Sequence, residues 1–238
     1  MTEMYRNHII AQLPATTCAA VLAKSRVIPV QSDQELVLAG PVSNYVYFPE
    51  TALLSLSHVL PSAEYTELMT VGCDGMLAAP AAGPGQRHFI AQAVVSGAIL
   101  RVAQSELRAI AMEHRSLQRL LNDAQDTTTQ HLYHVIACYR HHTITQQLSR
   151  LLLSHDDRFP RQPIVTTHAK LARRLGVRRE AVSTVAGMLQ KMGALEYHRG
   201  RIEYIDRGML LTCSCSCYQL LRQIQQKKPG NQCRALSY

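Results

Sequence analysis

Several features that mark other classes of protein are missing from this chain of 238 residues. No window of 18 residues is apolar throughout, as a membrane-spanning helix would require. The first thirty residues show no basic start followed by a continuous apolar run, so we expect no secretory signal. Low-complexity stretches and internal repeats are also missing. These absences favour a globular protein of the cytoplasm with no membrane partner.

The seven cysteines do not form the pattern of a disulfide framework, because they are odd in number and widely scattered. A reducing cytoplasm accounts for them. Cys213, Cys215 and Cys217 are close in sequence, but on a helix only Cys213 and Cys217 would be neighbours on one face. Tetrahedral zinc would need further ligands that this spacing does not reveal. We therefore predict local packing, with no metal site and no cofactor, and leave a redox role open.

An enzyme with a catalytic metal would need histidine and carboxylate ligands clustered on neighbouring strands. The strand-like part of the chain offers only His58 and His88, and it has no His-x-His motif. We therefore predict that the protein is not an enzyme. A protein-interaction module without specific DNA binding stays open as the alternative function.

Excess positive charge is confined to the C-terminal part of the chain. Residues 1–139 contain 8 Lys and Arg against 11 Asp and Glu, whereas residues 140–238 contain 17 against 6. The net charge of +8 therefore arises entirely after residue 139. A basic module joined to a mildly acidic one indicates that the basic module meets a polyanion, although a solvated basic surface would have the same composition.

The N-terminal half has the pattern of a β domain. After a short helical start at residues 1–24, apolar runs of strand type alternate with turn residues up to about residue 102. The predicted strands are 35–39, 45–48, 53–60, 65–71, 89–95 and 99–103. Many short strands with regular turns favour an antiparallel sandwich or barrel, here a jelly roll. Because helices follow, the predicted fold class is α+β.

Two helices are predicted after the strands, with Ser105 and Ser116 as their N-caps. The second is long, and its inner positions follow a 4-3 heptad spacing. This seam consists of Leu117, Leu121, Ala124, Thr128, His131, Val135 and Cys138. From 117 to 139 the helix would extend roughly 34 Å, too far to pack on a small β domain alone. We predict that the seam joins two chains in a homodimer, with packing inside one chain as the alternative.

The segment 166–204 has the pattern of a helix-turn-helix followed by a hairpin. Thr167 is in an N-cap position before a first short helix. Gly176 supplies the tight turn, and Val177 fills the angle between the helices. The second helix is predicted from 178 to about 192.

The outer face of that second helix suits DNA, because its inner arc is apolar and its outer arc is polar. Arginine can bond bidentately to guanine, glutamate can accept from cytosine, and Ser or Thr can reach bases or phosphates. The predicted base-reading residues are Arg178, Arg179, Glu180, Ser183 and Thr184. Gly187 lies on the same arc and would allow close approach, unless it is simply a tolerated weak position in the helix.

The residues after Gly193 predict a β hairpin, the wing of a winged helix, with strands at 195–197 and 202–205. Its arginines are placed to hold phosphates, which position a protein on DNA without reading sequence. The predicted phosphate contacts are Thr167, His168, Lys191, His198, Arg199 and Arg201. The alternative is a helical hairpin whose charged outer face is merely solvated.

In this order the segments resemble the Crp/Fnr family of bacterial transcription regulators over nearly the whole chain. GVRREAVSTVAGML at 176–189 resembles the family's recognition helix, whose hallmark is an Arg-Glu pair and a basic or polar residue four positions later. Arg179 and Glu180 match the pair, and Thr184 occupies the later position, where the catabolite activator protein has arginine. The shorter motifs VYFPE, VGCDGM and CSCSCY resemble a branch of the family without a well-known ligand.

The resemblance implies a β-roll sensor of cyclic-nucleotide-binding type, a dimerisation helix and a winged helix. It implies double-stranded DNA, a second copy of the chain and RNA polymerase as partners. A further amphipathic helix is predicted at 143–154 and a linker at 156–163, both before the DNA-reading helices. The predicted parts are the sensor at 1–115, the dimerisation helix at 116–140, the DNA-binding domain at 141–226 and a flexible tail at 227–238.

Two ligand signatures of the family are missing from the sensor part. Cyclic-nucleotide binders carry a Gly-Glu pair for the ribose and an Arg-Ser or Arg-Thr pair for the phosphate. Here Gly72 precedes Cys73, and Arg87 precedes His88. Oxygen sensors of the family use an N-terminal cysteine cluster for an iron–sulfur centre, whereas only Cys18 lies there. We therefore expect an effector other than cAMP, or no small-molecule effector.

Overall fold

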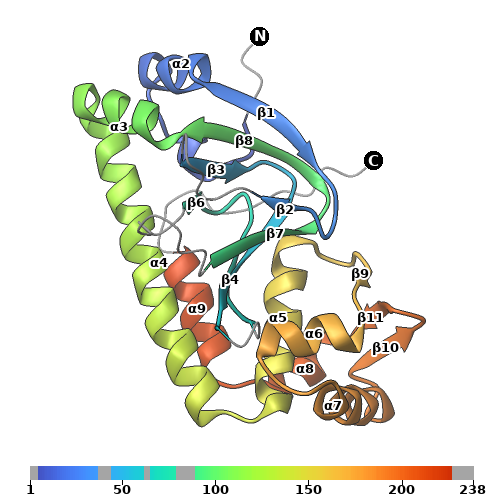
Figure 1. Cartoon of the computed structure of the whole chain (residues 1–238). Coiled ribbons are helices and arrows are strands. Elements are labelled where there is room, and N and C mark those ends of the chain that lie inside the picture. The colour runs from blue at the N-terminus through green and yellow to red at the C-terminus, as the bar shows by residue number, and fades with distance from the viewer. Residues whose placement is uncertain (1–4, 37–43, 62–64, 79–88, 227–238) are drawn as a thin grey trace. The chain divides into compact units, whose positions relative to one another are not determined.

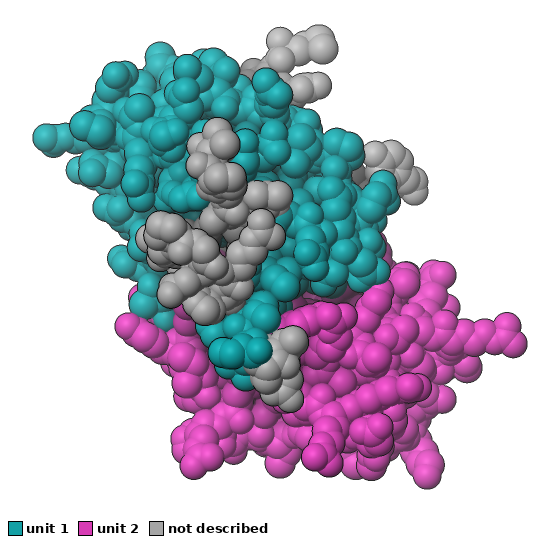
Figure 2. Space-filling model, viewed as in Figure 1, with its two compact units in different colours: residues 1–62, 68–129, 228–233 teal, residues 63–67, 130–227, 234–238 magenta. Residues whose placement is uncertain are grey.

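The computed structural model describes residues 5–36, 44–61, 65–78 and 89–226. The chain divides into two compact units, coloured separately in Figure 2. The division falls inside a long helix, between Thr129 and Gln130. The predicted tail at 227–238 and the sensor residues Arg87 and His88 lie outside the described residues. In the described part, no helix is both long enough and apolar enough to cross a membrane.

Two antiparallel sheets of four strands form the β part of the chain (Figure 1). One has the order β1-β8-β3-β6, formed by Ser25–Val30, Gly97–Ala103, Tyr45–Pro49 and Leu77–Ala78. The other has the order β2-β7-β4-β5, formed by Glu35–Leu36, Phe89–Val95, Leu53–Val59 and Tyr65–Val71. The predicted α+β class is thus confirmed. The predicted strands missed β6, which has only two residues, and all of β1, which contains Pro29.

Residues of β3 alternate between two cores, as the period of a strand requires. Val46 and Phe48 are buried among apolar residues of four helices. These helices are α1 (His8–Ala11), α2 (Ala15–Ala23), α3 (Gln104–Glu113) and the first half of α4 (Arg115–His141). Tyr47 lies on the other face, buried with Leu54 and Ala91 of the second sheet. Burial on both faces explains the continuous apolar run of the VYFPE motif.

The two helices after the strands begin earlier than predicted, so both N-cap predictions are wrong. The N-cap of α3 is Ala103 rather than Ser105, and α4 already begins at Arg115, before Ser116. The Ser116 hydroxyl instead lies 3.4 Å from the Thr17 hydroxyl. This tertiary contact competes with the local capping contact that the sequence pattern assumes.

The second unit begins with the end of α4 and with α5 (Ile144–Arg158). Thr143 caps α5 through a capping box with Gln146. The helix continues four residues beyond its predicted end and takes in part of the predicted linker. Asp156 is held there by an ion pair with the guanidinium of Arg207. This partner is about fifty residues away, so the local composition on which the linker prediction rested does not reveal it.

Four more helices and a small sheet complete this unit. They are α6 (His168–Leu175), α7 (Arg179–Lys191), α8 (Arg207–Cys213) and α9 (Cys217–Gln226). The sheet has the order β10-β11-β9, formed by Leu195–His198, Arg201–Ile205 and Ile164–Val165. Its core joins Leu148, Leu152, Leu171, Val182 and Leu189. At roughly 1.5–3 kcal/mol for each buried side chain, this cluster holds the helices of the unit together.

The seam predicted on α4 is buried within the chain itself. Its buried members are Leu117, Ala124, His131, Val135 and Cys138. Leu117 and Ala124 belong to the core of the first unit, and Val135 packs against Leu221 and Ile224 of α9. The prediction that these positions face a second chain is corrected accordingly. For them the alternative, packing inside one chain, describes the structure.

Candidate nucleic-acid interface

The turn between α6 and α7 has the conformation that its residues favour. Thr167 caps α6, because its hydroxyl accepts a hydrogen bond of 3.2 Å from the backbone N–H of Lys170. Gly176 ends the helix with a φ of 66°, in the left-handed region where glycine is favoured. α7 follows with Arg178 as N-cap and Arg179 as its first residue, one position after the predicted start.

Helix α7 buries one face and exposes the other. Val182, Ala186 and Leu189 are buried. Exposed residues on the outer face are Arg178, Arg179, Glu180, Thr184, Gly187 and Lys191. The Thr184 hydroxyl donates a 3.0 Å hydrogen bond to the Glu180 carbonyl and keeps its acceptor lone pairs exposed. Two guanidinium groups and a carboxylate therefore stand free at the end of the helix that meets base edges in helix-turn-helix proteins.

Ser183 and His168 contact each other. The Ser183 hydroxyl and Nδ1 of His168 are 2.9 Å apart, and both residues are half-buried. The imidazole also stacks on the ring of Tyr197 in the wing, with centroids 4.4 Å apart. Burial lowers the pKa of His168 and the Arg179 charge lowers it further, so the ring is neutral at pH 7.

These contacts involve two predicted site residues. Stacking on Tyr197 and the contact with Ser183 hold the His168 ring in place in the chain alone, and its contact with a phosphate stays a prediction. The Ser183 hydroxyl is engaged by His168 in the chain alone, and its contact with a base stays a prediction. Together they fasten α6, α7 and the wing to one another.

The wing is a hairpin with a two-residue turn. His198 pairs with Arg201, which leaves Arg199 and Gly200 at the tip with φ values of 43° and 85°. Positive φ at both positions is the requirement of a type I′ turn. His198 and Arg199 are exposed there, and Arg201 is paired with Glu203 through a 3.0 Å contact between Nε and Oε1. Because both partners are well exposed, this ion pair costs little to break on binding a phosphate.

A glycine interrupts the outer face of α7 at position 187. A Cβ atom added there would have no neighbour within 4 Å in the chain. Packing therefore does not require glycine, although glycine in a helix costs up to about 1 kcal/mol relative to alanine. The helix backbone at Gly187, between Thr184 and Lys191, is therefore accessible to a molecule outside the chain.

Behind this face, a charged network joins the ends of three helices. Arg207 at the start of α8 donates hydrogen bonds to Asp156 and to Asp157 of α5, the latter at 2.7 Å. The Tyr218 hydroxyl of α9 donates to Asp157 at 2.9 Å. The sequence offers no signal for these contacts, because the partners are about fifty or more residues apart and share no motif.

The first unit contains an open pocket of about 400 Å³ between β3, β6, α3 and the start of α4. Its apolar lining includes Val46, Met76 and Leu107. Its polar lining consists of Gln104, Arg108, Gln118, Asn122 and Gln125. The described lining contains one guanidinium and no carboxylate.

Comparison with known proteins places this geometry in a known fold. The family model of the Crp-like helix-turn-helix domain matches residues 146–213. Among solved structures, the chain is similar to a Crp/Fnr-family protein of Eubacterium rectale, with a TM-score of 0.68 and 14% identity over 87% of this chain and 98% of that one. It is also similar to FixK2 of Bradyrhizobium japonicum, with a TM-score of 0.67 and 18% identity over 81% and 98% of the two chains.

A third similar structure is the c-di-GMP responsive global regulator CLP of Xanthomonas campestris, with a TM-score of 0.62 and 14% identity over 81% of this chain and 100% of that one. A comparison with curated protein sequences finds no significant match. Identities this low indicate a shared fold and not a shared ligand. The chain therefore has the fold of the Crp/Fnr transcription regulators and carries a Crp-like helix-turn-helix domain at residues 146–213.

Proposed function

We propose that the protein is a sequence-specific DNA-binding transcription regulator that reads the major groove with α7. The observation that carries this proposal is the exposed start of α7, where Arg178, Arg179 and Glu180 are free of contacts with the core. Arginine and glutamate are side chains that distinguish base pairs by their edges. The exposed wing residues Arg199 and Arg201 supply positive charge for the neighbouring phosphates.

The regulator would act as a homodimer through a face of α4 other than the seam. Tyr133 and Ile136 are large apolar side chains there, and they are 68% and 63% exposed. Leu132 is half-buried and lies four residues before Ile136, on the same side of the helix. A second copy would cover this apolar patch and place two recognition helices on half-sites about 34–36 Å apart, in an inverted repeat. RNA polymerase would be the partner through which the bound dimer changes transcription.

Selection of duplexes from a random pool by the purified protein tests this function. We expect an inverted repeat to emerge, bound at least about 1,000-fold more tightly than unrelated DNA. Affinity should fall steeply with salt, because the arginines and lysines of the interface release counterions from the phosphates. Recovery of no motif, together with no salt-dependent gel shift, would favour the alternative, a protein-interaction module.

The effector would be a molecule other than cAMP, or none. At 100 times its dissociation constant, a ligand of the folded state adds about 2.7 kcal/mol of stability, which is visible as a melting shift. We expect millimolar cAMP and cGMP to cause no shift in the melting temperature. Burying a cyclic phosphate is costly when no cation is placed to pair with it. A clear cAMP shift in thermal denaturation would contradict this expectation. A metabolite screen by the same assay would identify an alternative ligand.

Substituting Gly187→Ala should separate fold stability from DNA affinity. Alanine should stabilise α7 by up to about 1 kcal/mol, because the added methyl group meets no other residue of the chain. The same methyl group should weaken DNA binding if the helix backbone approaches the duplex at this position. Thermal melting and DNA titration of the same preparation give both quantities. Unchanged DNA affinity would show that the glycine is only a weak position in the helix.

A further inference from the structure

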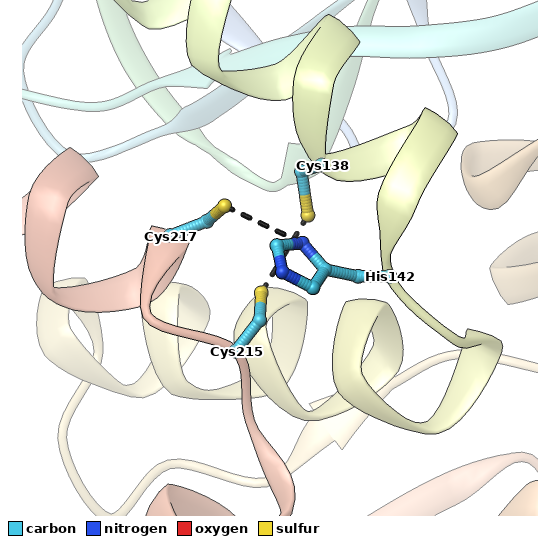
Figure 3. A group of neighbouring side chains, drawn as sticks. All are labelled: Cys138, His142, Cys215 and Cys217. Atoms are coloured by element: carbon cyan, nitrogen blue, oxygen red, sulfur yellow. Dashed lines mark hydrogen bonds between the residues drawn. The ribbon is translucent and has the colours of Figure 1, made fainter.

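Four side chains that can bind a metal lie together in the second unit (Figure 3). Cys138 lies in the last turn of α4, and His142 directly follows the helix, where its backbone N–H donates a 3.0 Å hydrogen bond to the Cys138 carbonyl. Cys215 lies in the segment that joins α8 to α9, and Cys217 is the first residue of α9. One potential ligand atom from each residue lies within 4.8 Å of the other three. The three cysteines are buried, and all are free thiols.

A break between two helices brings the alternate cysteines to one point. α8 ends at Cys213, α9 begins at Cys217, and Ser214 between them is extended, with φ −84° and ψ 164°. The rule that alternate residues of a helix do not share a face therefore does not apply to Cys215 and Cys217. Cys213 is not part of the group, although the i, i+4 spacing had singled it out as a partner of Cys217.

Two of the distances within the group are close to the edges of a tetrahedral zinc site. The sulfurs of Cys138 and Cys215 are 3.6 Å apart, and the sulfur of Cys217 is 3.5 Å from Nδ1 of His142. Zinc bonds of about 2.3 Å to sulfur and about 2.0–2.1 Å to nitrogen imply edges of about 3.8 Å between sulfurs and about 3.6 Å between sulfur and nitrogen. A disulfide between Cys138 and Cys215 would instead need its sulfurs about 2.05 Å apart.

A buried cation lies beside the four ligands. Arg150 of α5 is 6% exposed and interacts electrostatically with Tyr139, Cys138 and Cys215. Its Nε atom has no hydrogen-bond partner in the described part of the chain. Three thiolates, a neutral imidazole and a divalent ion together carry a charge of about −1, which the guanidinium would balance. Thiolates bound to a metal would give this buried guanidinium a negative partner beside the ring of Tyr139, over which it lies at 5.9 Å.

We propose that Cys138, His142, Cys215 and Cys217 bind one Zn²⁺ ion that fastens α9 to the end of α4. Cysteine thiolates and imidazole are the ligands of structural zinc sites, and four protein ligands leave no open position for catalysis. On binding, each thiol that is still protonated releases its proton. The ion reinforces the contact of Val135 with Leu221 and Ile224 in the same pair of helices. The site does not depend on the proposed DNA binding.

Metal analysis of the purified full-length chain tests the site. Elemental mass spectrometry should find about one zinc per chain. In competition with a coloured zinc chelator, Cys215→Ser and Cys217→Ser should weaken binding by more than the 10–100-fold loss that changes to outer-shell partners typically cause. Cys213→Ser is the matched control, because it removes a cysteine of the same CSCSC run outside the group and should retain the wild-type zinc content.

The wild-type protein decides the question even if the serine variants fold poorly. Replacement of zinc by Co²⁺ should give the intense visible absorption of a tetrahedral ion and a thiolate charge-transfer band. Chelation should lower the melting temperature, and added zinc should restore it. The proposal would be overturned if the reduced wild-type protein takes up no zinc. It would also be overturned if the purified protein contains a Cys138–Cys215 disulfide and still binds no zinc after that disulfide is reduced. Copper in the purified protein would overturn the identity of the ion.

Discussion

Substituting Ile136→Glu on α4 is expected to convert the dimer to a monomer and to weaken binding to the inverted repeat by about 100–10,000-fold. Ile136 is 63% exposed, and Tyr133, three residues before it, is 68% exposed. In the proposed dimer this patch is covered by the partner helix, so the glutamate would bury an unpaired charge. A monomer binds each half-site separately and loses the millimolar effective concentration that the linked second domain provides.

Sedimentation of the purified protein measures the change directly, and a titration with full and half sites measures its effect on DNA. Leu211→Glu is the matched control, since Leu211 is an apolar residue of α8 that is 41% exposed and lies outside α4. It should leave the dimer intact. Wild-type protein that sediments only as a monomer, with and without DNA, would contradict the dimer. If the Ile136→Glu variant stays dimeric, the dimer interface lies on another surface of the chain.

The heptad spacing on α4 shows what a sequence pattern can and cannot determine. The 4-3 spacing predicted seven inner positions of α4, of which five are buried and two, Leu121 and Thr128, are half-buried. It could not say what covers them, because a helix of the same chain and a helix of a second chain demand the same apolar stripe. At Val135 the neighbours are Leu221 and Ile224, which lie more than eighty residues later. Tyr133 and Ile136 fall outside the stripe and remained unnoticed.

The helix-turn-helix was predictable because its signals are local. The Thr167 cap and the left-handed Gly176 act within a few residues and fix the ends of α6. The contact of His168 with Ser183 was not predictable, because it depends on the angle between two helices and on where the wing places Tyr197. Side chains on the outer arc of a helix are therefore only candidates for DNA contact until their neighbours from other elements are known.

The cysteine cluster was missed for a related reason. Cys138 lies in the helix predicted at 116–140 and His142 just after it, whereas Cys215 and Cys217 follow more than seventy residues later, so no compact ligand motif is visible in the sequence. The CSCSC run was treated as a continuous helix, whereas the chain is extended between α8 and α9. An irregular segment of three residues, 214–216, decides which sulfurs can meet, and helical periodicity does not describe such a segment.

Arg179→Ala and Glu180→Ala are expected to cost about 1–3 kcal/mol each at the specific site, or about 5- to 150-fold in affinity. Both residues are exposed at the start of α7. Their loss should relax base preference and leave binding to random DNA nearly unchanged, because base contacts supply discrimination. Arg179→Lys is the matched control, since it keeps the charge and loses the bidentate geometry. It should lower the affinity for the specific site almost as much as Arg179→Ala does.

Arg199→Ala and Arg201→Ala in the wing should behave differently. Each removes a positive charge and should weaken binding to every duplex, with the slope of log affinity against log salt reduced by about 0.9. Arg201 is paired with Glu203, so Glu203→Gln should strengthen binding to all duplexes by freeing this guanidinium and removing a negative charge near the phosphates. Titrations on specific and random duplexes at several salt concentrations separate the two classes. Equal losses on both duplexes for all four alanine variants would contradict the division between a base-reading helix and a phosphate-binding wing, because a base contact is lost only where its base is present.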